Sequence, residues 1–138
     1  MSRENVDSVA RSWELWLRRD FDAWLETIDP DIEWDLSAYP LVDWPDHGKG
    51  RQELLKQVTQ YVAGWVGHHQ EVRELIDAGD DVVAVVHETA RMRESGATLD
   101  RDLIFVFTLR EGRAVRWRVF ETKEDALEAV GLSEQDAQ

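Results

Sequence analysis

The sequence predicts a single α+β domain, because helical patterns fill most of its first half and long strand patterns fill most of its second half. Apolar residues recur at three- and four-residue spacing over residues 4–18 and 51–66, which indicates one buried face on each of two helices. From residue 69 onward, runs of β-branched and aromatic residues alternate with short turn signals, as in antiparallel hairpins. A chain of 138 residues fits one domain, and we expect about residues 4–132 to be ordered.

The first half of the chain contains three predicted helices, one strand and one long loop. After the helix over 4–18, Asp20 is expected to cap a short helix that carries apolar residues as far as Ile28. The segment 29–31 contains a proline that ends this helix, and residues 32–36 alternate as in a strand with two different faces. Residues 37–50 are rich in proline and glycine and predict a loop, and the helix over 51–66 is expected to stop at Gly67.

The second half predicts strands near 69–78, 81–93, 98–110 and 113–121, then a helix over 123–130 and a frayed tail over 133–138. Both faces of these strands carry apolar residues, for example Val83 and Val85 on one face and Val82 and Val86 on the other. The helices can cover one face. We therefore expect a homodimer in which a second copy covers the other face of the sheet.

Composition narrows the possible partners. The formal net charge of −13 disfavours nucleic acid and anionic lipid surfaces. The chain has no cysteine, which excludes disulfides and thiolate chemistry. The apolar runs are strand-length, and the first residues lack the pattern of a signal peptide, so we expect a cytoplasmic protein that binds neither nucleic acid nor membrane.

The order of these elements, together with several short segments, resembles a known family. The segments are Asp31-Ile32-Glu33-Trp34-Asp35, then Ala78-Gly79-Asp80-Asp81-Val82-Val83, and finally 107–118 followed by 126–132. They are similar to the SnoaL-like branch of the nuclear transport factor two-like superfamily, and the resemblance covers residues 5–132. It implies a ketosteroid isomerase-like cone, in which a strongly curved mixed or antiparallel sheet wraps around the N-terminal helices and encloses a hydrophobic pocket. The superfamily contains isomerases, dehydratases, epoxide hydrolases, polyketide cyclases and non-catalytic domains, so the function has to be argued from the site.

The resemblance suggests three acidic residues as catalytic candidates. Asp35 is similar in position to the general base of ketosteroid isomerases, and the alternative is a solvated acid at a strand edge. Asp102 is similar to the protonated aspartate of their oxyanion hole, and the alternative is that Asp100 and Asp102 pair with Arg91, Arg93 or Arg116. Glu88 falls on the first acid of the epoxide hydrolases. We expect Asp35, Glu88 and Asp102 to converge on one pocket, where crowding of carboxylates would raise one or more pKa values.

The complete residue set of a known enzyme in the superfamily is not present. Ser12 and Trp13 occupy the stretch where the isomerases carry a tyrosine. Val86 and Val119 fall where the epoxide hydrolases need an arginine and a second acid. His87 lies on the strand face opposite Glu88, and the neighbours His68 and His69 point to opposite faces, so we expect no metal site.

Strand parity and helical stripes also predict which residues line the pocket. Trp44 and Tyr39, in the loop over 37–50, are candidates to close it. The full set of predicted pocket-lining residues is Trp13, Glu33, Tyr39, Trp44, Trp65, Val86, Ile104, Trp117, Val119 and Glu121.

Two functions remain open at this stage. The first is a cofactor-free acid/base enzyme, of the isomerase, dehydratase or polyketide cyclase type, acting on a small apolar ring or carbonyl compound. Asp35 would be its base, and Asp102 or Glu88 would be an acid or hydrogen-bond donor. The alternative is a non-catalytic module for ligand binding or dimerisation, which the incomplete match to every catalytic set favours.

Overall fold

The computed structural model describes residues 2–41 and 44–133, which form four helices and six strands. The helices are α1 (Ser2–Leu17), α2 (Phe21–Leu25), α3 (Arg51–Ala63) and α4 (Lys123–Ala129). The strands are β1 (Ile28–Asp35), β2 (His47–Lys49), β3 (Trp65–Ala78), β4 (Asp81–Met92), β5 (Thr98–Arg110) and β6 (Arg113–Phe120). Two residues of the predicted loop, 42 and 43, and positions 134–138 of the predicted tail lie outside the described residues.

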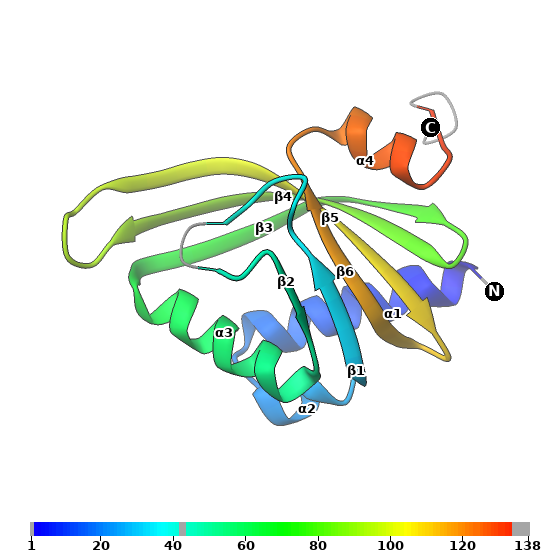
Figure 1. Ribbon diagram of the computed structural model, residues 1–138, viewed down its shortest axis with the longest axis horizontal. Helices are drawn as coiled ribbons and strands as arrows, with labels where there is room; N and C mark the ends of the chain where they lie inside the picture. The colour runs from blue at the N-terminus through cyan, green and yellow to red at the C-terminus, as the bar shows by residue number, and fades with distance from the viewer. Residues whose placement is uncertain (1, 42–43, 134–138) are drawn as a thin grey trace.

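The strands form one mixed sheet in the order β2-β1-β6-β5-β4-β3. Strands β1 and β6 run parallel, and the other neighbouring strands are antiparallel. The sheet is open rather than closed into a barrel, and α1, α2 and α3 lie on one side of it while α4 lies on the other (Figure 1). The predicted α+β class is confirmed.

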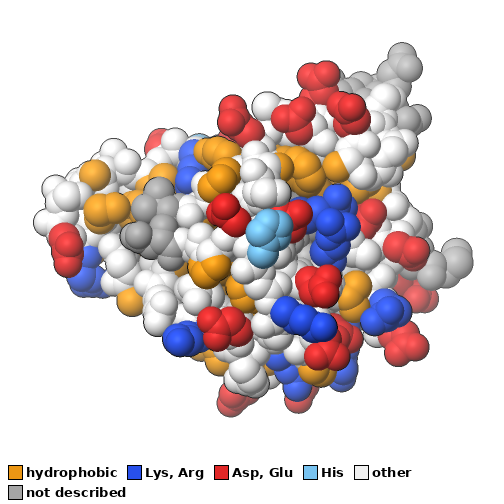
Figure 2. Space-filling view, viewed as in Figure 1, with side chains coloured by type: hydrophobic (Ala, Val, Ile, Leu, Met, Phe, Trp, Pro, Cys, Tyr) orange, Lys and Arg blue, Asp and Glu red, His pale blue; other side chains and the backbone are white. Residues whose placement is uncertain are grey.

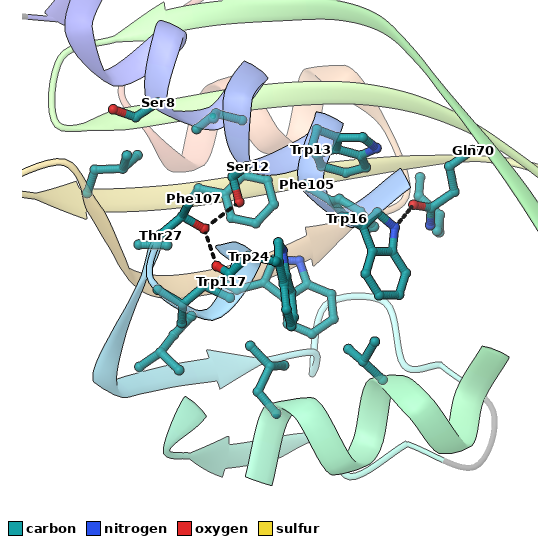
Figure 3. A pocket seen from close by; sticks show the side chains of 18 of the residues that line it. Ser8, Ser12, Trp13, Trp16, Trp24, Thr27, Gln70, Phe105, Phe107 and Trp117 are labelled. Carbon is teal, nitrogen blue, oxygen red and sulfur yellow. Dashed lines mark hydrogen bonds between the residues drawn. The ribbon is translucent and has the colours of Figure 1, made fainter. Parts of the chain in front are cut away.

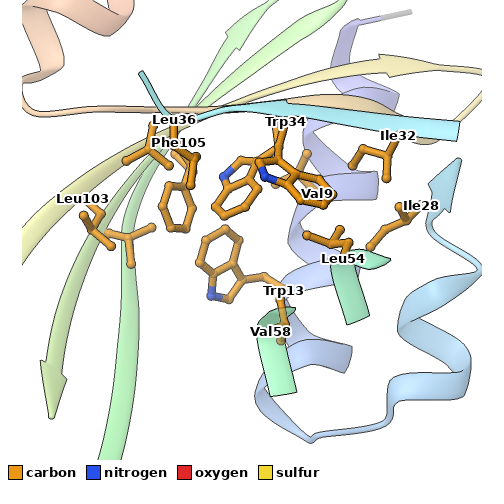
Figure 4. Close-up of a cluster of buried hydrophobic side chains, with 14 of the residues drawn as sticks. Val9, Trp13, Ile28, Ile32, Trp34, Leu36, Leu54, Val58, Leu103 and Phe105 are labelled. Carbon is orange, nitrogen blue, oxygen red and sulfur yellow. The ribbon is translucent and has the colours of Figure 1, made fainter. Parts of the chain in front are cut away.

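The main hydrophobic core fills the space between the sheet and the first three helices. Figure 4 shows a single cluster of buried side chains that includes Val9 and Trp13 from α1, Leu54 and Val58 from α3, and Phe105 on β5. These residues come from the predicted helical stripes and strand faces, and all five are buried. The stripe on each helix therefore determines which helix face meets the sheet.

The β1–β2 hairpin depends on a close contact between Trp34 and Gly48. Trp34 is only 2% exposed, and its indole Nε1 donates to the carbonyl oxygen of Pro45 at 3.2 Å. A Cβ atom on residue 48 would overlap the indole ring of Trp34, so the ring packs directly against the glycine backbone. Strand β2 lies inside the region that the sequence predicted to be a loop, and it pairs with β1 at Glu33, Trp34 and Asp35.

A second, smaller core lies on the opposite face of the sheet, beneath α4. Ala126 and Leu127 of α4 pack there on Val83, Ile104 and Val106. Helix α4 thus supplies cover for this apolar face, which was the reason for expecting a second subunit. The homodimer stays a prediction, but this apolar surface no longer requires it.

Helices α2 and α3 both end earlier than the sequence predicted. Helix α3 ends at Ala63, because Gly64 caps it and Trp65 already belongs to β3. Gly67 instead lies within β3, with a φ of +65°, where the β3–β4 register shifts between Val66 and His69. A glycine at positive φ is typical of such a bulge.

The short helix α2 also stops early. Asp20 caps it as predicted, accepting from the backbone N–H of Ala23 at 3.3 Å, but the helix ends at Leu25. Ile28 begins β1, and Pro30 sits where the pairing with β6 is irregular, which is where a strand tolerates proline. Among the described helices, none has both the length and the apolar character needed to cross a membrane.

Candidate functional site

A cavity of about 120 Å³ lies between the first three helices and the sheet. Five of the seven tryptophans line it, namely Trp13, Trp16, Trp24, Trp44 and Trp117. Several of these rings pack edge to face. Trp117 makes T-shaped contacts with Trp44, at a centroid distance of 5.4 Å, and with Phe105, at 5.6 Å. An engineered cavity of roughly 150 Å³ in another protein holds benzene, so the space here is on the scale of one aromatic ring.

Glu88 is the acidic residue that lines this cavity, and it is completely buried. It stands on β4, and its Cα partners in the sheet are Gln70 on β3 and Arg101 on β5. The alternation along the three strands therefore brings a carboxylate, an amide and a guanidinium to the same side of the sheet.

Donors surround both carboxylate oxygens of Glu88. Oε1 accepts from Arg101 Nε at 3.1 Å, from Arg101 Nη2 at 3.0 Å and from the Tyr61 hydroxyl at 3.3 Å. Oε2 lies 3.0 Å from Gln70 Nε2, which donates to it, and 2.7 Å from His68 Nε2. Trp16 fixes the Gln70 amide in turn, because its Nε1 donates to Gln70 Oε1 at 3.0 Å (Figure 3). The carboxylate has little acceptor capacity left for a ligand.

The electrostatics of the network keep Glu88 ionised. Burial by itself raises the pKa of Glu88, but the hydrogen bonds from His68 and Gln70 and the charge of Arg101 outweigh it, and the net pKa is lowered. Burial also raises the pKa of Tyr61, and the neighbouring Glu88 carboxylate raises it further. Tyr61 therefore remains a neutral phenol, which accepts from Arg101 Nη2 at 2.8 Å while it donates to Glu88.

His68 is the group of this network with a free nitrogen. Its side chain is only 4% exposed, and the residue lines the cavity. An ionised carboxylate can only accept, so the proton between Glu88 and His68 belongs to Nε2. In the neutral imidazole this tautomer leaves a lone pair on Nδ1, and Nδ1 has no hydrogen-bond partner among the described residues. A buried imidazole oriented by a carboxylate in this way is the usual arrangement of a general base.

Three of the tryptophans carry unused donors. The indole Nε1 atoms of Trp13, Trp44 and Trp117 are buried without an acceptor in the part of the chain that the structure describes. An unpaired buried N–H group costs about 1–3 kcal/mol. A ligand with oxygen acceptors would offset part of that cost.

A second polar group lies at another part of the cavity wall, on α1 and the segment after α2. Ser12 Oγ is 2.8 Å from Thr27 Oγ1, and the Thr27 hydroxyl donates to the backbone oxygen of Trp24 at 2.6 Å. Figure 3 shows Ser8, Ser12 and Thr27 separated in the view from Trp16 and Gln70, with aromatic rings between them. The cavity is therefore apolar in its middle and polar in two places.

The predicted convergence of three carboxylates does not occur. Glu88 lines the cavity, whereas Asp35 lies in a surface groove with Glu33, His47 and Arg116. The inward positions of this segment are taken by Ile32, Trp34 and Leu36, so their neighbours point to the outer side. Figure 2 shows acidic and basic side chains intermixed on the face that carries β1 and β2.

Asp35 has local partners in that groove. The backbone N–H and the hydroxyl of Ser37 both donate to its Oδ1, at 2.9 Å and 2.6 Å. These hydrogen bonds lower the pKa of Asp35, which is the opposite of the shift that a buried proton shuttle requires.

Asp102 points to the outer face of the sheet, on the same side as Ile104. Its side chain is 56% exposed, and its Oδ1 lies 2.8 Å from His87 Nδ1 and 3.8 Å from Arg73 Nη1. Asp100 lies 2.8 Å from the other ring nitrogen of His87. The two aspartates thus pair as the alternative interpretation proposed, but with His87 and Arg73 rather than with Arg91, Arg93 or Arg116.

The predicted pocket-lining residues divide into three groups. Trp13, Trp44 and Trp117 line the cavity. Val86 and Val119 are fully buried in the surrounding main core without lining it, while Ile104 belongs to the core under α4. Trp65, Tyr39, Glu33 and Glu121 lie outside the cavity wall: Trp65 contacts the Tyr61 ring at 6.1 Å, Tyr39 lies under the Arg101 guanidinium at 5.9 Å, and the two glutamates are exposed.

Four residues of this network were not predicted as site residues from the sequence, namely His68, Gln70, Tyr61 and Arg101. One signal could have found Arg101, because it stands opposite Glu88 when the β4–β5 register is counted from the turn. The same count fails for Gln70, because the β3–β4 register shifts between Val72 and Glu74. The position of His68 depends on the bulge at Gly67, which strand alternation alone does not predict.

The fold and the site define a class of protein: a cone-like α+β domain with helices and sheet around an internal aromatic cavity. Residues 9–117 match the family model of the SnoaL-like domain. The chain therefore belongs to the SnoaL-like family. None of the curated proteins matches it.

Solved structures show the same fold at low sequence identity. An NTF2-like protein of unknown function from Burkholderia pseudomallei K96243 is 18% identical, with a TM-score of 0.75 over 93% of this chain and 98% of that one. TerC, co-crystallised with polyporic acid, is 21% identical, with a TM-score of 0.72 over 92% and 98%. A protein with a ketosteroid isomerase-like fold from Catenulispora acidiphila DSM 44928, in complex with trimethylamine, is 14% identical, with a TM-score of 0.61 over 80% and 81%.

Proposed function

We propose that this protein is a cofactor-free acid/base enzyme that moves a proton on a small, flat carbonyl compound bound in the aromatic cavity. The observation that carries the proposal is His68: a buried imidazole that Glu88 holds at 2.7 Å through Nε2, with no partner on Nδ1 among the described residues. In this scheme Nδ1 is the base, and Glu88 is a positioning residue rather than the proton donor suggested by sequence. A carboxylate that stays ionised, and whose two oxygens already accept hydrogen bonds, is a poor proton shuttle. It is well suited to orient the imidazole of a neighbouring histidine.

The cavity favours a ring compound with oxygen acceptors. Its walls are aromatic and its volume of about 120 Å³ is on the scale of one ring. A carbonyl oxygen would supply an acceptor that the indole N–H groups of Trp13, Trp44 and Trp117 lack among the described residues. A donor that reaches this oxygen would stabilise the negative charge that develops on it when a neighbouring carbon loses a proton. The fold neighbours crystallised with polyporic acid and with trimethylamine support a small-molecule cavity of this kind.

Exchange of carbon-bound protons tests the proposal without knowledge of the natural substrate. Acetophenone, a ring with a methyl ketone, is incubated with the protein in D₂O, and deuterium incorporation into its methyl group is followed by proton NMR. The base removes a methyl proton to give the enolate, and a solvent-derived deuteron returns to the same carbon. We expect the wild-type protein to accelerate the exchange and His68→Gln to lose at least about 100-fold of that acceleration, the usual contribution of a general base.

His69→Gln is the matched control, because His69 is the adjacent histidine on β3 and is exposed on the outside. The His69→Gln variant should accelerate deuterium exchange into acetophenone as much as the wild-type protein does. A wild-type rate in His68→Gln would refute the assignment of the base.

The second candidate function is non-catalytic ligand binding, favoured by the absence of any complete catalytic set of the superfamily. It predicts that acetophenone binds with the same affinity to the wild-type protein and to His68→Gln, while neither protein accelerates deuterium exchange.

A further inference from the structure

We propose that Ser12, oriented by Thr27, forms a second polar subsite of the cavity that binds a hydroxyl group, or another hydrogen-bond donor, on the ligand. The inference rests on the proposed function, because it assigns a chemical feature to the ligand of the same cavity. It is independent of the acid/base step at His68.

The direction of the hydrogen bonds makes Ser12 an acceptor. A hydroxyl group carries a single proton. The proton of Thr27 is used on the Trp24 carbonyl oxygen, which cannot donate, at 2.6 Å. In the 2.8 Å contact between Ser12 Oγ and Thr27 Oγ1, Ser12 must therefore be the donor. Its own proton is then occupied, and what Ser12 Oγ offers to a ligand is lone pairs (Figure 3).

The spacing along α1 places this acceptor about one turn from the network of Glu88. Ser12 and Trp16 are four residues apart and lie on the same helix face, which corresponds to about 6 Å along the axis. Trp16 joins the Gln70–Glu88 network through its indole nitrogen. Ser12 and His68 line the same cavity, and the wall between the two polar places is formed by rings such as Trp13 and Phe105.

The two polar places therefore differ in kind. The wall formed by Trp13, Trp44 and Trp117 carries unpaired donors, which favour a ligand oxygen that accepts. Ser12 carries an acceptor, which favours a ligand group that donates. The ligand class that satisfies both is a ring with a carbonyl on one side and a hydroxyl, as in a phenol or an alcohol, on the other.

Calorimetric titration of two matched ketones tests this inference at a pH where the phenol is neutral. 4-Hydroxyacetophenone and 4-methylacetophenone differ by a hydroxyl in place of a methyl group. We expect wild-type protein to bind the hydroxy compound about fivefold more tightly, as for one net hydrogen bond. Ser12→Ala should abolish this preference, so that both ketones bind with about equal affinity. The affinity for the methyl compound should change by less than about twofold. Ser37→Ala, the same substitution in the surface groove at Asp35 and outside the cavity wall, should keep the preference.

Thr27→Val tests the direction of the bond. Valine keeps the shape of threonine but cannot accept, so the Ser12 hydroxyl becomes free to donate. We expect 4-methoxyacetophenone, whose methoxy oxygen only accepts, to bind this variant about threefold or more tightly than it binds wild type. Thermal melting checks that each variant is folded.

The outcomes separate the two proposals. If the methyl ketone binds wild type but the hydroxy compound gains nothing, or if Ser12→Ala keeps the preference, the subsite is refuted and the cavity proposal stands. If neither ketone binds wild-type protein, the small-molecule function and the subsite are both refuted.

Discussion

Glu88 and His68 form a buried pair, with Oε2 and Nε2 2.7 Å apart and both side chains at most 4% exposed. The pair joins neighbouring strands β3 and β4, and Arg101 on β5 supplies the positive charge that the carboxylate needs in the interior. A buried carboxylate without such partners would be neutral. The site therefore depends on three strands whose relative register is fixed by their hairpins.

Substitution of Glu88 should destabilise the fold strongly. Glu88→Gln leaves the Arg101 guanidinium, which is 20% exposed, without its counter-charge. Removal of one partner of a buried ion pair typically costs about 3–5 kcal/mol, and we expect a loss of about 3 kcal/mol of unfolding free energy in urea denaturation. The control is Asp102→Asn, at the 56% exposed carboxylate of the outer face, where we expect a change within about 1 kcal/mol. Similar losses in both variants would contradict the structural role given to Glu88.

The difference between these two acids also shows what the sequence could predict. Helical stripes and strand alternation predicted the four helices, five of the six described strands and both apolar faces of the sheet, but not β2. They could not say which face lies under α1 and α3 and which lies under α4. Asp102 shares its face with Ile104, and that face is covered by α4, so a choice of the wrong apolar face moved Asp102 into the predicted pocket.

The position of His68 was beyond sequence reasoning for a different reason. The parity of β3 changes at the Gly67 bulge and again between Val72 and Glu74, so a count along the strand does not preserve the side of a residue. The positions of two tryptophans were easier to predict. Trp13 lies on a helical stripe and Trp117 on a strand face that is buried at Trp117 and Val119, and both tryptophans line the cavity as predicted.

The stability contributed by Glu88 should depend on pH. Its pKa is lowered in the folded state from an ordinary value of 4.5, so folding favours the ionised form. This contribution is complete above the unfolded-state pKa and disappears as the pH falls through the lower folded-state pKa. We expect the difference in unfolding free energy between wild type and Glu88→Gln to be constant just above about pH 5 and to shrink below about pH 4.5. Urea denaturation over this range measures it, and a difference that grows on acidification would reverse the assigned sign.

The contact between Trp34 and Gly48 should make residue 48 intolerant of any side chain. An alanine Cβ would overlap the indole, so either the ring or the β1–β2 hairpin must move. We expect Gly48→Ala to lower the unfolding free energy by about 2 kcal/mol, as for an overpacked core. Gly64→Ala is the control, since Gly64 has φ −77° and its nearest contact is 3.6 Å away, and we expect a change within about 1 kcal/mol. Equal stability of Gly48→Ala and wild type would show that the packing of Trp34 is not specific.

A substitution that fills the cavity separates space reserved for a ligand from a packing defect. Val58 lines the cavity from α3 and is 8% exposed, so the larger ring of Val58→Phe can enter the empty space. Filling a void removes few existing contacts, and we expect the unfolding free energy to stay within about 1 kcal/mol of wild type or to rise. Affinity for acetophenone should fall at least about tenfold in the same variant, because ring and ligand compete for one volume. Val62→Phe, one turn further along α3 and outside the cavity wall, should bind acetophenone as wild type does. If Val58→Phe were stable and bound acetophenone unchanged, the ligand would occupy another site, and the cavity would only be a gap between helices and sheet.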